Sequence, residues 1–347
     1  MKSFYSPGHG RHDPGQLPQP VGGSDNYYSE VAARGYLLLD ALRAGGFGPI
    51  IAPDDAGLER IASVHSRQLL DFLATAFDRM AQINRRTTVL VPENFAVARN
   101  PLRVGASIWA QLGHFCYDTS SPIFQHTWDA AYWSAQCAIN AADAVAQGAT
   151  TSYALCRPPG HHAGADLYGG FCYLNNAAIA AQRLVDDGAR AAILDVDYHH
   201  GNGTQSIFYP RADVLFCSLH ADPDHDYPFY WGYADETGAG PGVGYTRNLP
   251  LPLGCDESTY LDALGTALAT VAAFAPDVLV ISLGFDTFAG DPVGTFALTT
   301  ESFQRIGAQC GRLGLPTVVV QEGGYARAAL GANLTAFLTG LLDGSRA

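Results

Sequence analysis

The stretch Ala191-Ala-Ile-Leu-Asp-Val-Asp-Tyr-His-His-Gly-Asn-Gly203 decides the fold. It opens with a short apolar run, too brief for a helix, which predicts a strand buried on both faces of a parallel sheet. Alternate side chains of an extended chain point the same way, so Asp195, Asp197 and His199 begin on one face. A carboxylate and an imidazole at the end of a buried strand suit a small divalent cation. Taken alone, such a pair is more often a capping aspartate beside a histidine at the core edge.

The segments around this stretch repeat the order strand, loop, helix. Strands are expected at 152–155, 191–194, 214–219, 278–283 and 317–320, and helices at 174–187, 257–274, 301–313 and 327–342. Earlier, apolar spacing of three and four predicts helices at 27–44, 66–83 and 127–147, whereas 1–26 is expected to be loop or a weak strand and 84–107 a long loop. Alternating units imply an α/β fold with a mainly parallel central sheet covered by helices on both faces. No shift in composition marks a boundary, so residues 1–347 are expected to form a single domain.

The overall composition is that of a globular protein, with 48% hydrophobic and 15% charged residues among 347. No segment is apolar over the roughly 18 residues that a membrane span needs. The amino terminus lacks the apolar core of a signal peptide, so a cytoplasmic location is expected. The seven cysteines are odd in number and form no Cys-x-x-Cys pair, so we expect reduced, mostly buried residues and neither disulfides nor a cysteine-based zinc site.

The formal charge of −13, with Lys2 as the only lysine, is unfavourable for binding nucleic acid. Binding to phosphates needs clustered cations, which this chain lacks. A strongly negative protein attracts a cationic substrate. Solubility alone also explains the charge, so the charge does not identify the substrate.

Polar residues cluster just beyond the predicted strand ends, where ligands bind in open α/β sheets. The segments that follow the five strands are Arg157-Pro-Pro-Gly-His-His162, Asp195-Val-Asp-Tyr-His199, His220-Ala-Asp-Pro223, Gly284-Phe-Asp-Thr287 and Gln321-Glu-Gly-Gly-Tyr325. Because parallel strands end at one edge of a sheet, we expect these side chains to meet on one rim.

The residue types on this rim indicate a metal-dependent hydrolase. Asp197, His199 and Asp286 would give a metal two oxygens and one nitrogen and leave a position for water, which is the arrangement of catalytic zinc. Such a metal lowers the pKa of its water toward about 7 and polarises a carbonyl as a Lewis acid.

The remaining rim residues suit proton transfer. His161 and His162 are candidates for general acid and base, since imidazole titrates near neutrality. Asp195 and Asn202 are candidates to fix their tautomers, and Tyr325 is a candidate donor to a developing oxyanion. Together these residues predict hydrolysis of an amide or an ester.

Each residue also has an ordinary structural explanation. Paired histidines in a Pro-Gly loop and a tyrosine after Gly-Gly are more often structural. His220 is expected to support its strand, and His200 to pack beneath the site. Only the joint occurrence of the whole set favours a catalytic site.

The chain resembles the zinc-dependent histone deacetylase superfamily, which has the arginase–deacetylase fold. The motifs that carry the resemblance are Arg157-Pro-Pro-Gly-His-His-Ala163, Gly169-Gly-Phe-Cys-Tyr-Leu-Asn-Asn176, Asp195-Val-Asp-Tyr-His-His-Gly-Asn-Gly203, Gly284-Phe-Asp-Thr-Phe-Ala-Gly-Asp-Pro292 and Glu322-Gly-Gly-Tyr325. They follow the order of the family, and weaker similarity extends across nearly the whole chain.

The resemblance implies one zinc ion on Asp197, His199 and Asp286. It also implies that His162 is the general base and acid, that His161 paired with Asp195 supplies electrostatics, and that Tyr325 polarises the scissile carbonyl. Asn202 departs from the branch of the family with Asp at this position and matches the polyamine and class II-like branch. His162 is therefore expected to be less basic than in the Asp branch.

The resemblance extends to substrate and potassium sites. Gly170, Phe171 and Tyr227 look like the walls of a narrow tunnel. One potassium site would use Asp195, Ser218 and Leu219 with the backbone of Asp197 and His199, and a second would use Phe208, Arg211, Val214 and Tyr245.

Within the superfamily, the segment 220–238 is most similar to the bacterial acetylpolyamine amidohydrolases. This implies a small cationic acetylated amine as substrate, with Glu93 or Asp118 receiving its distal ammonium. Residues 84–107 match the inserted loop that builds a homodimer and narrows the tunnel. The alternatives are deacetylation of acetyl-lysine in proteins and a non-catalytic binding module; ureohydrolysis with two manganese ions is disfavoured by too few carboxylates near Asp197.

Overall fold

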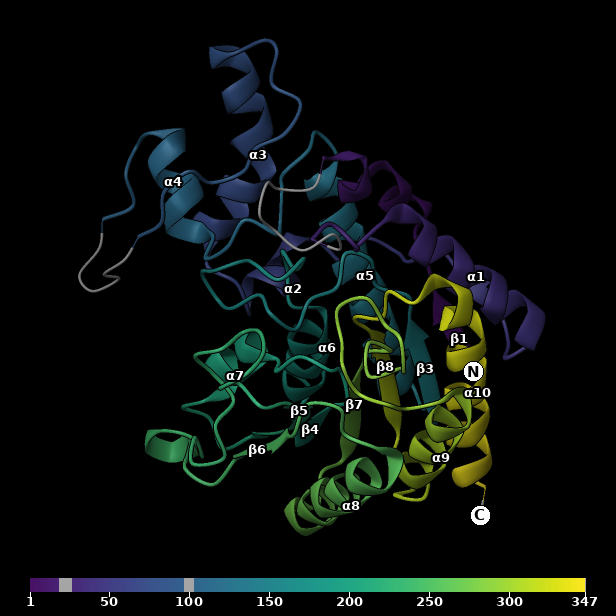
Figure 1. Cartoon of the computed structure of the whole chain (residues 1–347). Coiled ribbons are helices and arrows are strands. Elements are labelled where there is room, and N and C mark those ends of the chain that lie inside the picture. The colour runs from purple at the N-terminus through teal and green to yellow at the C-terminus, as the bar shows by residue number, and fades with distance from the viewer. Residues whose placement is uncertain (19–26, 97–102, 347) are drawn as a thin grey trace.

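A single eight-stranded sheet forms the centre of the computed structural model, which describes residues 1–18, 27–96 and 103–346 (Figure 1). The strands are β1 (Lys2–Phe4), β2 (Ile50–Ile51), β3 (Thr151–Ala154), β4 (Ala191–Asp195), β5 (Val214–Ala221), β6 (Thr246–Leu251), β7 (Val278–Leu283) and β8 (Thr317–Gln321). They lie in the order β2-β1-β3-β8-β7-β4-β5-β6, and every neighbouring pair is parallel. The predicted α/β fold with a parallel sheet is confirmed.

Helices cover both faces of the sheet because its strands are apolar on both. In β7, Val278 and Val280 belong to one hydrophobic core, while Leu279 and Ile281 belong to the other. The first core is closed by α3 (Arg67–Ile83), α4 (Ile108–Phe115), α5 (Thr127–Ala146) and α6 (Asn176–Val185). The second is closed by α1 (Ala32–Gly45), α8 (Glu257–Phe274), α9 (Thr300–Gly311) and α10 (Arg327–Gly344). This is the two-faced burial that the apolar strand runs predict.

Several short elements are absent from the sequence-based prediction. They are the strands β2 and β6, the helices α2 (Leu58–Ala62), α4 and α7 (Asn202–Phe208), and the 3-10 turns Pro7–Arg11, Pro14–Gln16 and Gly240–Gly242. β6 contains Pro250, and a proline within an apolar run argues against a strand. An edge strand tolerates proline, and β6 lies at an edge of the sheet. The helices that were missed have 5 to 8 residues, fewer than the roughly 11 over which helical periodicity can be recognised.

The expected dimer loop lies between α3 and α4, which Figure 1 shows projecting away from the sheet. The structure describes residues 84–96 and 103–107 of this segment, and the remaining residues 97–102 lie outside its described part. A backbone bridge pairs Leu90 with Ile123. The role of the loop in a homodimer stays a prediction.

All seven cysteines are free and buried, as expected from their spacing. Their thiols lie within the core instead of forming disulfides. Among the helices of the described residues, none combines the length and the apolar character that a membrane crossing requires.

Candidate active site

The loops that follow the central strands meet at the carboxyl edge of the sheet. Asp195 is the last residue of β4, and the register places it beside Ser218 of β5 and Ser282 of β7. The segments after β3, β7 and β8 reach the same place and bring His162, Asp286 and Tyr325 to it. The predicted gathering of polar residues on one rim is present.

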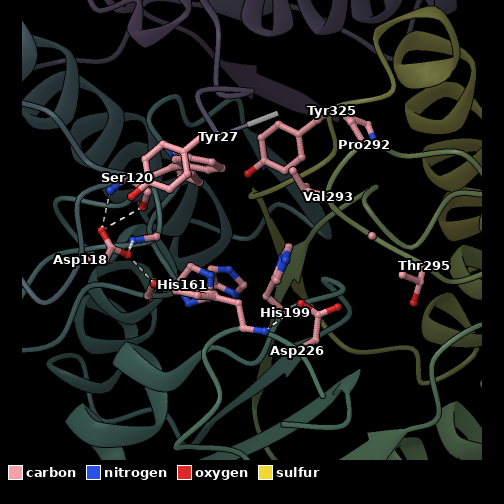
Figure 2. Close-up of a pocket in the computed structure, with 16 residues that line it drawn as sticks. Tyr27, Asp118, Ser120, His161, His199, Asp226, Pro292, Val293, Thr295 and Tyr325 are labelled. Atoms are coloured by element: carbon pink, nitrogen blue, oxygen red, sulfur yellow. Dashed lines mark hydrogen bonds between the residues drawn. The ribbon is translucent and has the colours of Figure 1, made fainter. Parts of the chain in front are cut away.

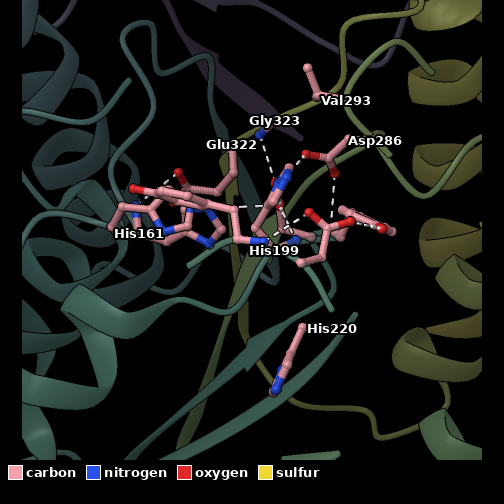
Figure 3. Close-up of polar contacts among 12 residues, drawn as sticks. His161, His199, His220, Asp286, Val293, Glu322 and Gly323 are labelled. Atoms are coloured by element: carbon pink, nitrogen blue, oxygen red, sulfur yellow. Dashed lines mark hydrogen bonds and ion pairs between the residues drawn. The ribbon is translucent and has the colours of Figure 1, made fainter. Parts of the chain in front are cut away.

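Asp197, His199 and Asp286 form a compact set of potential metal ligands, because their ligand atoms all lie within 4.8 Å of one another. His199 Nδ1 lies 3.1 Å from Asp286 Oδ2 and 3.4 Å from Asp197 Oδ1. Figure 3 shows His199 and Asp286 turned toward each other. Two carboxylates and one imidazole therefore face a common point, the donor set that a divalent cation needs.

The surroundings of this set fit a bound cation. The carboxylates of Asp197 and Asp286 are both fully buried. Burial, together with the negative charge of Asp197, raises the pKa of Asp286 to about 7. A cation between the two carboxylates would offset both the loss of hydration and their repulsion. Asp197 Oδ2 also accepts the backbone N–H of Gly323 at 2.8 Å, and Asp286 Oδ1 accepts that of Tyr198 at 3.0 Å, which fixes both side chains.

His161 and His162 have different partners. His162 Nδ1 donates to Asn202 Oδ1 at 2.7 Å, which leaves Nε2 as the lone-pair nitrogen. His161 Nδ1 donates to Asp195 Oδ2 at 3.0 Å, and its Nε2 lies 3.7 Å from Asp197 Oδ1. The pairings that the sequence predicts for both histidines are present.

These partners give the two imidazoles opposite charge preferences. Burial lowers the pKa of His161, but the carboxylates of Asp197 and Asp195 outweigh burial and raise this pKa to about 10. Burial and the neighbouring charges of His161 and His199 hold the pKa of His162 well below its ordinary value. In the metal-free protein these surroundings favour the protonated form of His161 and the neutral form of His162.

Tyr325 lies across the site from the histidines, with its ring against that of Phe171 at a centroid distance of 5.6 Å. Burial raises the pKa of its hydroxyl well above the ordinary value, so it stays a hydrogen-bond donor. Its backbone N–H donates to Asp291 Oδ2 at 2.6 Å, which anchors the turn.

A cavity of about 520 Å³ reaches these side chains (Figure 2). It is lined by Tyr27, Asp118, Ser120, Pro159, His161, His162, Gly170, Phe171, His199, Asp226, Tyr227, Pro292, Val293, Gly294, Thr295 and Tyr325. The ring of Tyr227 stands at 90° to that of His162, with centroids 5.0 Å apart. The predicted wall residues Gly170, Phe171 and Tyr227 therefore do line the pocket.

Of the two acids expected to receive an ammonium group, only Asp118 lines the cavity. Glu93 is exposed and lies outside the lining formed by the described residues of the chain. A further acid, Asp226, lines the cavity and is not among the residues predicted from the sequence.

Comparisons with known proteins agree with this site. The histone deacetylase domain matches residues 28–341. The chain belongs to the histone deacetylase family. It is 46% identical over 347 residues to an acetylpolyamine amidohydrolase of Burkholderia pseudomallei, with 98% of each chain covered. It is 45% identical over 351 residues to acetylpolyamine amidohydrolase 1 of Pseudomonas aeruginosa, with both chains fully covered. A crystal structure of acetylpolyamine aminohydrolase from B. pseudomallei superposes with a TM-score of 0.91, at 45% identity and 98% coverage of each chain. The expected family, fold and deacetylase class are confirmed.

Other histidines of this histone deacetylase family member support the site. His220 Nδ1 lies 2.8 Å from Ser218 Oγ, and its Nε2 donates to the backbone oxygen of Gly232 at 2.8 Å. His200 is fully buried, and its ring lies 4.5 Å from that of His220. Both positions agree with the structural roles expected for these two residues.

The residues of the two expected potassium sites fall into two separate places. Asp195 and Ser218 are neighbours in the β4–β5 register. Phe208 ends α7, and its backbone oxygen accepts the N–H of Arg211 at 2.9 Å. The backbone oxygen of Tyr245 accepts the N–H of Phe216, close to the start of β5. Potassium binding at either place stays a proposal.

A buried ion cluster, which was not predicted from the sequence, holds the loop that carries Tyr325. Glu30 Oε1 lies 2.9 Å from Arg34 Nη1 and 2.8 Å from Arg157 Nε, and all three side chains are buried. Arg34 also donates to the backbone oxygens of Gly324 at 2.6 Å and of Glu322 at 2.8 Å. Its guanidinium lies 4.5 Å from the centroid of the Tyr325 ring. The only sequence signal was an acid four residues before an arginine, which is common on exposed helices.

Replacing Glu30 with Ala is expected to lower the free energy of unfolding by about 3–5 kcal/mol, because it leaves two buried guanidinium groups without a counter-charge. Chemical denaturation measures this loss. The matched control is Asp40→Ala, which removes an exposed partner of Arg43 and is expected to cost less than about 1 kcal/mol. Equal losses in the two variants would contradict the role given to Glu30.

Replacing Gly323 with Ala is expected to weaken metal binding by about 10- to 100-fold. The added Cβ would lie 2.3 Å from Asp286 Oδ2 and 2.6 Å from Asp197 Oδ2, so it would displace the ligand carboxylates. Competition with a chelator measures the affinity. Gly265→Ala is the control, because this helical position has open space around it and gains helix propensity. Wild-type affinity in Gly323→Ala would show that the metal does not use these oxygens.

Proposed function

We propose that this chain is a zinc-dependent amidohydrolase that removes the acetyl group from N-acetylated diamines and polyamines of the acetylputrescine and acetylcadaverine type. The observation that carries the proposal is the set Asp197, His199 and Asp286 at a cavity that also holds a neutral His162 and a protonated Tyr325. The full-length relatives named as acetylpolyamine amidohydrolases support the choice of substrate.

In the proposed mechanism the chain's own residues move the protons. A zinc ion on the three ligands, when bound, supplies a Lewis acid and lowers the pKa of a water molecule. His162 Nε2 accepts the proton of the attacking water and later gives a proton to the departing amine. The Tyr325 hydroxyl donates to the oxyanion that develops on the acetyl carbonyl. The charge on His161 stabilises the same developing negative charge.

Several features of the pocket favour a slender cationic substrate. Its aromatic side chains Phe171 and Tyr227 flank the catalytic histidine and tyrosine, which suits a methylene chain. The net charge of −13 favours the approach of a cation. Binding of one or two potassium ions and a homodimer built by residues 84–107 are further parts of the proposal, and the sequence resemblance supports them. A cytoplasmic location is also proposed, because the amino terminus lacks the apolar core of a signal peptide.

A substrate panel with the purified protein tests the proposal, with its metal content measured alongside. We expect acetylputrescine and acetylcadaverine to be hydrolysed with a higher kcat/KM than an acetyl-lysine peptide. A clear preference for the peptide would favour the alternative, a protein acetyl-lysine deacetylase. Absence of turnover with every substrate would favour a non-catalytic binding module.

A further inference from the structure

Two carboxylates, those of Asp118 and Asp226, line the pocket, and Figure 2 shows them on different sides of His199. An ionised carboxylate accepts about four hydrogen bonds. The bonds that the protein itself supplies distinguish the two residues. Only an oxygen with an open acceptor position can accept a hydrogen bond from a ligand.

Asp118 is fully engaged by the protein. Its Oδ1 accepts the backbone N–H and the hydroxyl of Ser120, each at 2.9 Å. Its Oδ2 accepts the backbone N–H of Gly170 and the hydroxyl of Tyr227, each at 2.8 Å. These four bonds fill the acceptor positions of the carboxylate. Asp118 therefore joins two residues of the pocket wall and has no position left for an ammonium group.

Asp226 has open acceptor positions. Its Oδ1 accepts the backbone N–H of Tyr227 at 2.8 Å, and its Oδ2 accepts the hydroxyl of Tyr198. Within residues 1–18, 27–96 and 103–346, no further hydrogen bond and no ion pair is found for this carboxylate. It is only partly buried and lines the cavity. Each oxygen can thus accept one more bond.

A hydroxyl lies beside this carboxylate. Thr295 Oγ1 is 2.9 Å from the hydroxyl oxygen of Tyr198, and Thr295 also lines the cavity. Because the proton of Tyr198 goes to Asp226, the hydroxyl of Thr295 donates to Tyr198. Its oxygen also accepts the backbone N–H of Gly254 at 3.4 Å and keeps one lone pair for a ligand. An ammonium group has three donors, and Asp226 with Thr295 supplies acceptors for it.

We propose that Asp226, together with Thr295, receives the distal ammonium group of the substrate, whereas Asp118 holds the pocket wall. This inference rests on the proposed deacetylation of N-acetylated amines and names the residues that select their charge. It replaces the expectation that Asp118 or Glu93 binds the ammonium group.

The variant Asp226→Asn tests the proposal through the selectivity for charge. The readout is the ratio of kcat/KM for acetylputrescine to kcat/KM for N-pentylacetamide, a neutral amide with methyl in place of ammonium. We expect the ratio to fall about 10- to 100-fold, mainly through KM for acetylputrescine, because a hydrogen-bonded charge pair is lost. Thr295→Val is expected to lower the same ratio by a smaller factor, and it keeps the test valid if Asp226→Asn does not fold.

Asp118→Asn is the matched control, because it also removes one charge from the pocket. The substitution weakens the hydrogen bonds of Asp118 to Gly170 and Tyr227 in the pocket wall, which affects both amides. We therefore expect kcat/KM to fall for both substrates while the ratio of the two values stays at the wild-type value. A wild-type ratio in Asp226→Asn and Thr295→Val, or a collapse of the ratio in Asp118→Asn, would overturn the proposal while leaving the amidohydrolase function intact. If the wild-type protein does not hydrolyse acetylputrescine, the proposed function fails and the subsite fails with it.

Discussion

The variant Tyr325→Phe is expected to lower kcat by about 10²- to 10³-fold with little change in KM, because it removes one donor to the developing oxyanion. The phenyl ring keeps the contacts with Phe171 and Arg34, so folding is expected to be preserved. Burial raises the pKa of Tyr325 well above its ordinary value. The fall in kcat should therefore be the same at any pH near neutrality. Steady-state kinetics with acetylputrescine as substrate measures this fall.

Tyr27→Phe is the control for this variant, because Tyr27 is another tyrosine in the lining of the same cavity. Its hydroxyl contacts Thr119, away from the metal ligands, so kcat is expected to stay near the wild-type value. A Tyr325→Phe variant with wild-type kcat would contradict the role of this hydroxyl. An equal fall in kcat/KM for both variants would indicate a general change in the pocket.

The metal ligands and their histidine partners are predictable from the sequence because their relation is local or set by the architecture. Asp195 ends β4, and Asp197 and His199 lie in the bend that directly follows it, so their closeness in the sequence keeps them together. Asp286 follows a different strand, and a parallel sheet brings strand ends to the same edge. The sheet order then places its strand β7 directly beside β4.

Contacts between distant segments could not be predicted in this way. Arg34 binds the backbone of Gly324, which is 290 positions away in the sequence, and no local pattern indicates that pair. The two acidic residues of the pocket lining also could not be told apart from the sequence. Asp118 and Asp226 look alike in the sequence, and only the number of hydrogen bonds that each accepts in the folded chain separates them.

The variant Asp286→Asn is expected to lose the bound metal and to lower kcat/KM by about four orders of magnitude or more, because several kcal/mol of transition-state stabilisation depend on the metal. The amide has nearly the shape of the carboxylate and can still accept the backbone N–H of Tyr198. Metal analysis of the purified variant and steady-state kinetics measure the two effects. The exposed Asp262→Asn on α8 is the charge-matched control.

Thermal unfolding with and without added Zn²⁺ separates a metal ligand from a structural aspartate at this position. Wild-type protein should gain about 2.7 kcal/mol of stability at a free zinc concentration a hundred times its Kd, and Asp286→Asn should gain far less. Without metal, Asp286→Asn is expected to be more stable than the wild-type protein. Burial and the charge of Asp197 raise the pKa of Asp286 to about 7 although His199 lies beside it, so the ionised carboxylate lowers the stability of the metal-free wild type at neutral pH, and the neutral amide avoids this cost. A metal-free variant less stable than the metal-free wild type, with an unchanged gain on adding zinc, would show that Asp286 supports the fold and does not bind the metal.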